Sequence, residues 1–419
     1  MNKRRMGCTL AALLLATQAV SAQEGRVRLQ ELLTEALRRN PEILAAQKGY
    51  EAARQRPSQA SSLPDPMFSP GYASNGRPWP GAMLGTEPTS NIGFMVSQEF
   101  PAAGKRKLRG DMAEKEAEAE FQQYQQTQLA VVSRVKQAYY RRAYAYAVTE
   151  VLDRNLALLL KLLRITEARY SVGRAAQQDI FKTQTQISIL ETRNVQLERE
   201  KEARAAELNS LLNRPPGSPM ARPEDLKPQE ITVELEELFT HAREKSPMLR
   251  REEKMIQRAE LAVNMARKEY YPDYTLSGGY FNMGGMPDMF QFRADLKLPI
   301  YFFRKQRAGV AEQAQNLAQS RRTYEAANQS LHFRIKDDHL MAETSAQLMR
   351  LYGQTVIPQA SLALESSLAS YETGAVDFLT VLMNNVTVVE YEMNYYEEMQ
   401  NLYIALSQLE EMTAMPLIP

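Results

Sequence analysis

The chain has little of the chemistry that active sites and covalent frameworks require. Its 419 residues include one cysteine, Cys8, one tryptophan and three histidines. A lone thiol cannot form an internal disulfide, and a Cys/His metal site needs several such ligands at close spacing. The sequence contains neither a phosphate-binding loop nor a nucleophile elbow. We therefore expect a protein that is not an enzyme and that binds no metal or other cofactor.

An excess of one charge is also missing. The chain has 51 Lys and Arg against 50 Asp and Glu, for a net charge of +1. Nucleic-acid-binding proteins usually carry a basic excess, so no nucleic-acid partner is expected. His332 and His339 lie seven residues apart, near Asp337 and Asp338. This spacing suits a helix seam or a solvated face better than a metal site.

Long hydrophobic runs are missing as well. A helix that crosses a bilayer needs about 20 apolar residues, and no such run occurs after Ala22. The first 22 residues combine the basic Lys3–Arg5 with the apolar Leu10–Ala16 and a small-residue site at Val20–Ala22. This pattern is typical of a secretory signal peptide, here residues 1–22. The mature chain would be exported without a cysteine and could enter a membrane only as strands.

The main feature that is present is a duplication. The segment LQELLTEALRRNPEI at Leu29 returns as LEELFTHAREKSPML at Leu235, and the turn YSVG at Tyr170 returns as YETG at Tyr371. The sequence thus predicts a first repeat over residues 23–214 and a second over 235–419. A proline-rich linker, 215–234, would form a belt between them at mid-height.

Each repeat contains strand patterns. In Phe290–Ile300 apolar and polar residues alternate, with Phe290, Phe292, Ala294, Leu296, Leu298 and Ile300 on one face and Gln291, Arg293, Asp295 and Lys297 on the other. Such alternation places one face in lipid or core and the other in water. Asn91–Phe100 alternates in the same way, and Met67–Tyr72 and Tyr274–Asn282 are weaker partners. Two hairpins are predicted, at about 67–100 and about 272–300.

Aromatic residues gather where these strands meet the expected helices: Tyr270, Tyr271, Tyr274, Tyr301, Phe302 and Phe303. Membrane barrels carry aromatic girdles at such positions, although a soluble four-stranded sheet packed on helices is the alternative. The smallest bacterial barrels have about 8 strands. Four membrane strands would therefore have to join those of other chains, which predicts an oligomer.

The helix patterns are unusually long. No proline interrupts Lys105–Tyr170, which would span roughly 100 Å, and Arg304–Tyr371 is broken only by Gly309, Gly353 and Pro358. Apolar residues recur near every seventh position, as in coiled coils. Shorter return helices complete helical hairpins at about 105–213 and about 304–415. By length, we expect Gln177–Asn213 to stack end to end with Ser246–Tyr271 beside the first long helix.

The ordered set of motifs resembles the TolC-like outer-membrane efflux channel family, the outer membrane factors of tripartite efflux pumps. The resemblance rests on the tips YSVGRAAQQD and YETGAVDFLTVL, the repeat openings NPE and SPM, and the junctions EFPAAGKRK and KLPIYFFRKQRAG. It implies a mixed α and β membrane protein and a homotrimer. A 12-stranded β-barrel in the outer membrane would continue as an α-helical barrel across the periplasm of a Gram-negative bacterium.

The same resemblance implies a passive exit duct. Its partners would be outer-membrane lipids, a periplasmic adaptor (membrane fusion) protein and an inner-membrane pump of RND or ABC type. The cargo would be a heavy metal or a drug, with the short GAVDFLTVL tip closer to the heavy-metal branch. The alternative is a periplasmic coiled-coil adaptor or scaffold that is not inserted in the membrane.

The resemblance also assigns residues to the periplasmic tip, where the tunnel narrows and meets the adaptor: Tyr170, Gly173, Asp179, Tyr371, Gly374 and Asp377. We further hypothesise that Arg174 pairs with an acidic tip residue to hold a closed state, the alternative being a solvated arginine. The aspartate follows the glycine by six residues in one turn and by three in the other. Met283, Met286 and Met289 could bind copper(I) through their thioethers, but a role as flexible apolar filler is the simpler interpretation.

Overall fold

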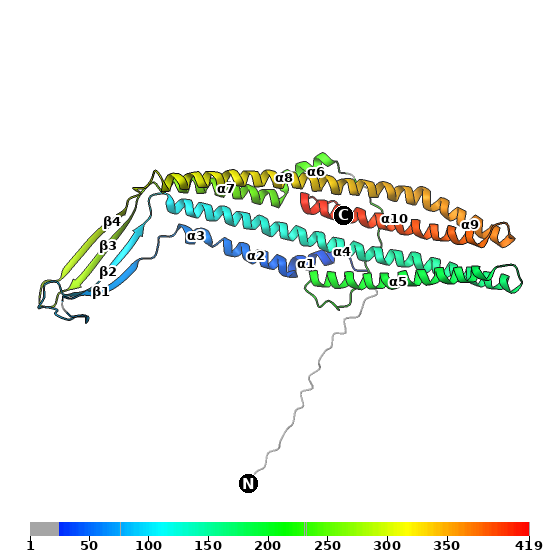
Figure 1. Ribbon diagram of the computed structural model, residues 1–419, viewed down its shortest axis with the longest axis horizontal. Helices are drawn as coiled ribbons and strands as arrows, with labels where there is room; N and C mark the ends of the chain where they lie inside the picture. Colours follow the sequence, from blue (N-terminus) through cyan, green and yellow to red (C-terminus); the bar gives the residue numbers. More distant parts are fainter. Residues whose placement is uncertain (1–24, 76, 230, 232, 419) are drawn as a thin grey trace, which may run out of the picture.

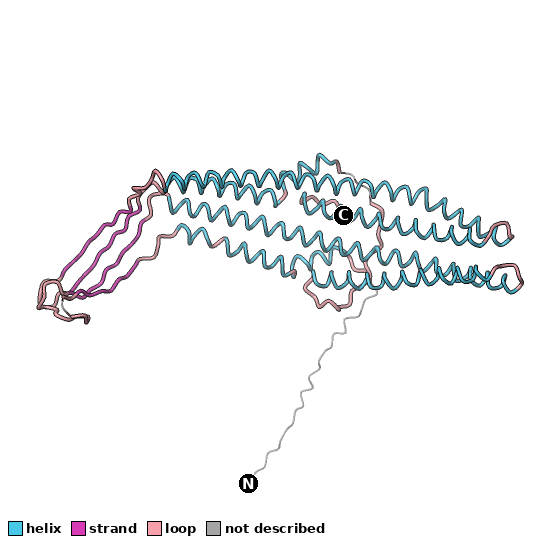
Figure 2. Tube along the Cα trace, viewed as in Figure 1, coloured by secondary structure: helices cyan, strands magenta, loops and turns pink. Residues whose placement is uncertain are grey.

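The computed structural model describes residues 25–75, 77–229, 231 and 233–418. The predicted signal peptide and Cys8 lie outside this part of the chain. The molecule is elongated, with a small sheet at one end and two helical tips at the other (Figures 1 and 2). The helices are α1 Leu29–Arg39, α2 Pro41–Ala53, α3 Arg56–Ser61, α4 Lys105–Ser171, α5 Gln177–Leu211, α6 Leu235–Lys245, α7 Pro247–Lys268, α8 Lys305–Leu351, α9 Ile357–Thr373 and α10 Phe378–Thr413.

The long helices form four adjacent rows. Helix α4 runs unbroken for 67 residues. On one side it contacts α5 and the α1–α3 segment, and on the other it contacts α7 and α10. Helix α8 packs on both α7 and α10, and α9 continues along α10. The rows are thus α3–α2–α1 with α5, then α4, then α7 with α10, then α8 with α9.

The predicted stacking of the first return helix with the second opening helix is wrong. Helix α5 shares its row with α1–α3 of its own repeat, whereas α7 lies on the opposite side of α4 (Figure 1). Asn40 shows why: its Oδ1 accepts from the N–H groups of Glu42 and Ile43 at the start of α2, while its Nδ2 donates to Leu211 O at the end of α5. The linker then carries the chain across the bundle to α6.

The apolar core consists of two clusters along the seams between rows. One lies at mid-height, where α1, α4, α6, α8 and α10 contribute side chains such as Leu32, Val135 and Leu402. The other lies toward the tips, among α4, α5, α9 and α10. Narrow seams of this kind leave much polar surface on both sides of the rows, as the predicted coiled-coil pattern requires.

The four strands form one antiparallel sheet in the order β1-β2-β3-β4, which joins the two hairpins through β2 and β3. The strands are β1 Met67–Ala73, β2 Asn91–Phe100, β3 Asp273–Asn282 and β4 Met289–Lys297. The predicted end of the last strand, Ile300, is wrong: Leu298 and Ile300 lie in the turn that follows. Pro299 has no N–H for the strand ladder, so pairing stops before it.

The register aligns the apolar residues of all four strands on one face. Phe68 lies opposite Val96, Phe94 opposite Tyr280, and Tyr280 opposite Phe290. Ser97, Ser277 and Arg293 lie on the other face, and the Ser277 hydroxyl donates to Ser97 Oγ at 2.9 Å. The sheet extends beyond the helices (Figure 2), and Phe292 is 86% exposed. The alternative of a sheet packed on its own helices is therefore wrong.

A π-helical segment, Tyr352–Val356, interrupts the last row between α8 and α9. The sequence predicted weak points here, at Gly353 and Pro358. A Cβ added at Gly353 would lie 3.2 Å from the ring of Tyr395 on α10. The first repeat has no matching interruption, since α4 is continuous over its whole length.

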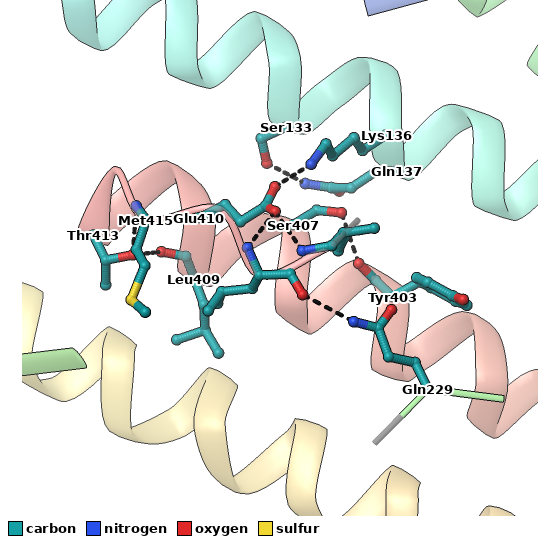
Figure 3. A network of polar contacts seen from close by, with 12 residues as sticks. Ser133, Lys136, Gln137, Gln229, Tyr403, Ser407, Leu409, Glu410, Thr413 and Met415 are labelled. Atoms are coloured by element: carbon teal, nitrogen blue, oxygen red, sulfur yellow. Dashed lines mark hydrogen bonds and ion pairs between the residues drawn. The ribbon is translucent and has the colours of Figure 1, made fainter. Parts of the chain in front are cut away.

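A buried polar network closes the belt at mid-height (Figure 3). The Glu410 carboxylate on α10 pairs with Lys136 on α4 and accepts from the N–H groups of Leu417 and Ile418, both at 2.8 Å. Gln229 of the linker donates to Leu417 O at 2.9 Å. The network therefore fixes both the linker and the segment after α10 to the first repeat.

Candidate functional site at the helical tips

The first tip is a glycine turn between α4 and α5. Gly173 has a positive φ of 73°, which favours glycine. Its N–H donates to Tyr170 O at 2.9 Å, and the N–H of Arg174 donates to Arg169 O at 2.8 Å, satisfying the last carbonyls of α4. Asp179 lies in the first turn of α5, where a carboxylate suits the helix dipole.

The second tip has the same backbone but a different helix start. Gly374 has a φ of 82°, and its N–H donates to Tyr371 O at 3.0 Å. Asp377 is the N-cap of α10 and accepts from both the N–H and the hydroxyl of Thr380. These hydrogen bonds, the hydroxyl's first, lower the pKa of Asp377. The two aspartates thus hold different helix positions, which explains their unequal distance from the glycines.

The two tips meet through Arg169 in the last turn of α4. Its Nη1 donates to Tyr371 O at 2.5 Å, and its guanidinium lies 4.4 Å from the centre of the Tyr371 ring. A Cβ on Gly374 would lie 4.0 Å from Arg169 Nη2. One arginine of the first repeat therefore holds both the tyrosine and the glycine of the second turn.

The equivalent tyrosines are not equivalent in their surroundings. Tyr371 is 6% exposed and packs edge-on against Phe378 at 5.9 Å, whereas Tyr170 is 45% exposed. Of the residues assigned to the tip, the structure brings Tyr371 and Gly374 together. Tyr170, Gly173, Arg174 and Asp179 lie along the first turn, and Asp377 caps α10.

Arg169 was missed by sequence reasoning, which selected Arg174. The Arg174 side chain is exposed and forms no ion pair with a described residue of its own chain. The only signal for Arg169 was a basic residue in the last helical turn, where it also suits the helix dipole. A solvated arginine would give the same signal.

The rest of the described chain offers no metal-binding chemistry of the common kind. Among residues 25–75, 77–229, 231 and 233–418, no three His, Cys, Asp or Glu side chains are grouped to hold a metal ion. His339 contacts Val233 O at 3.3 Å, in the seam that its spacing predicted. Met283, Met286 and Met289 lie between the ends of β3 and β4, where Met283 O accepts from Gly85 N–H of the other outer loop at 2.9 Å.

None of the described helices is long and apolar enough to cross a membrane.

Both repeats match one protein family. Residues 32–214 and 238–414 match the outer membrane efflux protein family. The chain belongs to this family. The family resemblance seen in the sequence is therefore confirmed, and so is the location in the outer membrane of a Gram-negative bacterium with helices that extend through the periplasm. The family consists of passive channels rather than enzymes, and its members act as trimers with adaptors and inner-membrane pumps.

Solved structures with the same fold are outer-membrane channels. VceC of Vibrio cholerae has a TM-score of 0.78 at 17% identity, over 92% of this chain and 95% of that chain. CmeC of Campylobacter jejuni has a TM-score of 0.70 at 14% identity, over 92% and 85%. MtrE of Neisseria gonorrhoeae, in its open state, has a TM-score of 0.69 at 18% identity, over 91% and 89%. These identities establish the fold alone, and no curated protein matches the chain in sequence.

Proposed function

We propose that three copies of the chain form an exit duct through the outer membrane. The duct conducts substrates passively from a periplasmic adaptor and an inner-membrane pump to the outside. The observation that carries the proposal is the sheet, whose four strands share one exposed apolar face and one polar face. An apolar outer face and a polar inner face are what a membrane barrel with an aqueous lumen needs.

The edges of the chain support a closed ring. Strands β1 and β4 are both edge strands, and exposed strand edges cannot remain unpaired in lipid. Three copies of the four-stranded sheet would give a 12-stranded barrel. The two outer rows likewise present exposed apolar side chains, which suit packing against a neighbouring copy: Phe181, Ile189 and Val195 on α5, and Phe333, Leu351 and Leu362 on the row of α8 and α9.

The helical tips are proposed to meet the adaptor and to close the duct. They lie farthest from the sheet (Figure 1), where an inner-membrane pump of RND or ABC type would be reached. Tyr170, Gly173, Asp179, Tyr371, Gly374 and Asp377 would form this contact. Arg169 would hold the two turns of one chain, while Arg174 would pair with an acidic tip residue of a neighbouring copy.

Membrane fractionation and single-channel recording test the duct. We expect a trimer that requires detergent and conducts ions after insertion into a planar bilayer. A soluble monomer would instead favour the periplasmic scaffold. Recording Arg174→Ala tests the closing contact separately: the variant should conduct more than the native protein, and an unchanged conductance would refute the role of Arg174.

The cargo is proposed to be a heavy-metal ion or a drug, selected by the pump rather than by the duct. A deletion strain should then become sensitive to one of these two classes. Growth measured on metal salts and on a drug panel, with the gene restored on a plasmid, distinguishes them.

A further inference from the structure

A buried ion-pair cluster lies where the sheet meets the helices. Lys105, at the start of α4, is 1% exposed. Its Nζ lies 2.9 Å and 3.0 Å from the two carboxylate oxygens of Asp273 and 3.3 Å from Glu269 Oε2. Asp273 Oδ1 also accepts from the Ala102 N–H at 2.7 Å. Both carboxylates are therefore satisfied by Lys105 and the backbone, which joins the two repeats at this junction.

Next to this cluster is a cavity of about 300 Å³. It is bounded by the end of α7, the bases of β3 and β4, and the start of α8. Its volume is in the range that binds small organic ligands. Two further lysines line it, Lys297 at the end of β4 and Lys305 at the start of α8.

These two lysines are not neutralised within the chain. Lys297 lies opposite Asp273 in the register, but Asp273 is held by Lys105. The nearest strand carboxylate, Asp295, pairs with Arg293 at 2.8 Å. Neither Lys297 nor Lys305 forms an ion pair with a described residue. The cavity thus has two ammonium groups available for an anion, and its existing carboxylates do not compete for them.

A further polar atom in the lining lacks a partner. Gln306 Oε1 is shielded from solvent and accepts no hydrogen bond from a described residue. Leaving a shielded acceptor unsatisfied costs about 1–3 kcal/mol. A hydroxyl or a protonated phosphate oxygen of a ligand would satisfy it.

The remaining walls are apolar or aromatic. Tyr271 and Tyr301 contribute phenol rings, and Leu298 is 63% exposed beside them. We propose that the cavity binds an anionic amphiphile, with a phosphate or similar oxyanion between Lys297 and Lys305 and its apolar part against Leu298 and Tyr301. The inference rests on the proposed duct, because the site would then lie where the lumen and the inner leaflet of the membrane are both within reach.

Phenyl phosphate is a suitable soluble probe because it joins one phosphate to one ring. Titration calorimetry of the purified trimer in a neutral detergent should show binding that is tighter than for inorganic phosphate and absent for phenol. Two charge-assisted hydrogen bonds contribute enough that Lys297→Gln with Lys305→Gln should weaken binding about tenfold or more. Lys107→Gln, an exposed lysine of α4 outside the cavity, is the matched control and should bind normally. Equal affinity in the double variant and the native protein would refute the site.

Two arms of the experiment identify the natural source of the anion. Block of the single-channel current by phenyl phosphate, lost in the double variant, indicates a ligand that arrives through the duct. Preferential binding of dihexanoyl phosphatidylglycerol over the zwitterionic phosphatidylcholine, lost in the same variant, indicates a membrane lipid. A preparation that forms no conducting trimer contradicts the proposed duct. A conducting trimer that binds phenyl phosphate equally with and without the two lysines contradicts the site alone.

Discussion

Arg169 is the residue on which the contact between the two tips depends. It combines a hydrogen bond to Tyr371 O with a position over the Tyr371 ring. Together such contacts are worth about 1–3 kcal/mol. Arg169→Ala should therefore loosen the second turn and raise the open probability of the channel by about tenfold, since 1.4 kcal/mol corresponds to a factor of ten.

Single-channel recording measures this change directly. Arg164→Ala, one helical turn earlier on α4, is a suitable control because that side chain makes no described contact with the second turn. The role of Arg169 would be disproved if both variants opened equally often. Arg169→Lys should recover only part of the closure, because lysine lacks the planar guanidinium that stacks on the ring.

Glu410 is the residue that fixes the mid-height belt. Its carboxylate serves the Lys136 ammonium and two backbone N–H groups at once (Figure 3). Glu410→Ala would leave a buried lysine and two donors unsatisfied, so we expect a loss of about 3–5 kcal/mol in unfolding free energy. Lys136→Met should cost less, because Glu410 would keep both backbone donors. Thermal unfolding in detergent compares them, and a greater loss for Lys136→Met would contradict this assignment.

Asp338 gives the belt a dependence on pH. Burial raises its pKa from 3.8 to about 6; Arg334 opposes the shift, and Asp337 and Glu411 add to it. The unfolded chain therefore ionises at lower pH than the folded one. Stability from this group falls as pH rises from about 4 to about 6, and the penalty is complete above that.

Asp338→Asn should remove this penalty. Because the carboxyl is only half-buried, we expect a gain of about 1 kcal/mol at pH 7 and none at pH 4. Unfolding measured across this pH range tests the difference. Glu312→Gln, an exposed carboxylate on the same helix, should leave the profile unchanged. An equal gain at both pH values would contradict the raised pKa.

At the scale of elements, the π-helical segment distinguishes the two repeats. A methyl group at Gly353 would meet the Tyr395 ring at 3.2 Å, so the ring must move. Overpacking of this kind costs about 1–3 kcal/mol, whereas alanine gains up to about 1 kcal/mol over glycine as a helix former. Gly353→Ala should therefore be destabilising.

Gly49→Ala is its matched control, because nothing lies within 4 Å of a Cβ at that position in α2. It should stabilise the protein by about 0.5–1 kcal/mol. Combining Gly353→Ala with Tyr395→Leu should remove the clash, so that the alanine becomes neutral or favourable in that background. If Gly353→Ala alone stabilised as much as Gly49→Ala, the close packing on Tyr395 would be disproved.

The lengths of the elements could be predicted from the sequence, but their neighbours could not. The predicted Asn91–Phe100 is strand β2, and the predicted Lys105–Tyr170 is one residue shorter than α4. Both depend on local periodicity and on the positions of proline. Equal lengths do not identify a partner, however, and the side chain of Asn40, which bonds Leu211 O, placed α5 with the helices of its own repeat. The choice of Arg169 over Arg174 was also beyond local pattern, because it depends on a chain reversal 202 residues away.

At the scale of the whole molecule, assembly depends on the two faces of the sheet. Phe292 points to the apolar face and is 86% exposed in the single chain, while its neighbour Gln291 lies on the polar face. If the apolar face contacts lipid, Phe292→Arg places a charge in hydrocarbon at a cost of about 2–4 kcal/mol per copy. Gln291→Arg places the same charge in a polar lumen at little cost.

The two variants therefore separate the membrane duct from any soluble assembly. Phe292→Arg should reduce the amount of trimer recovered from the outer-membrane fraction, because the penalty occurs three times in one barrel. Gln291→Arg should assemble normally and alter only the conductance or its ion preference, since the new charge lines the passage. Equal recovery of both trimers would mean that the apolar face does not contact lipid. In that case the aligned register of four strands would need another partner to cover it.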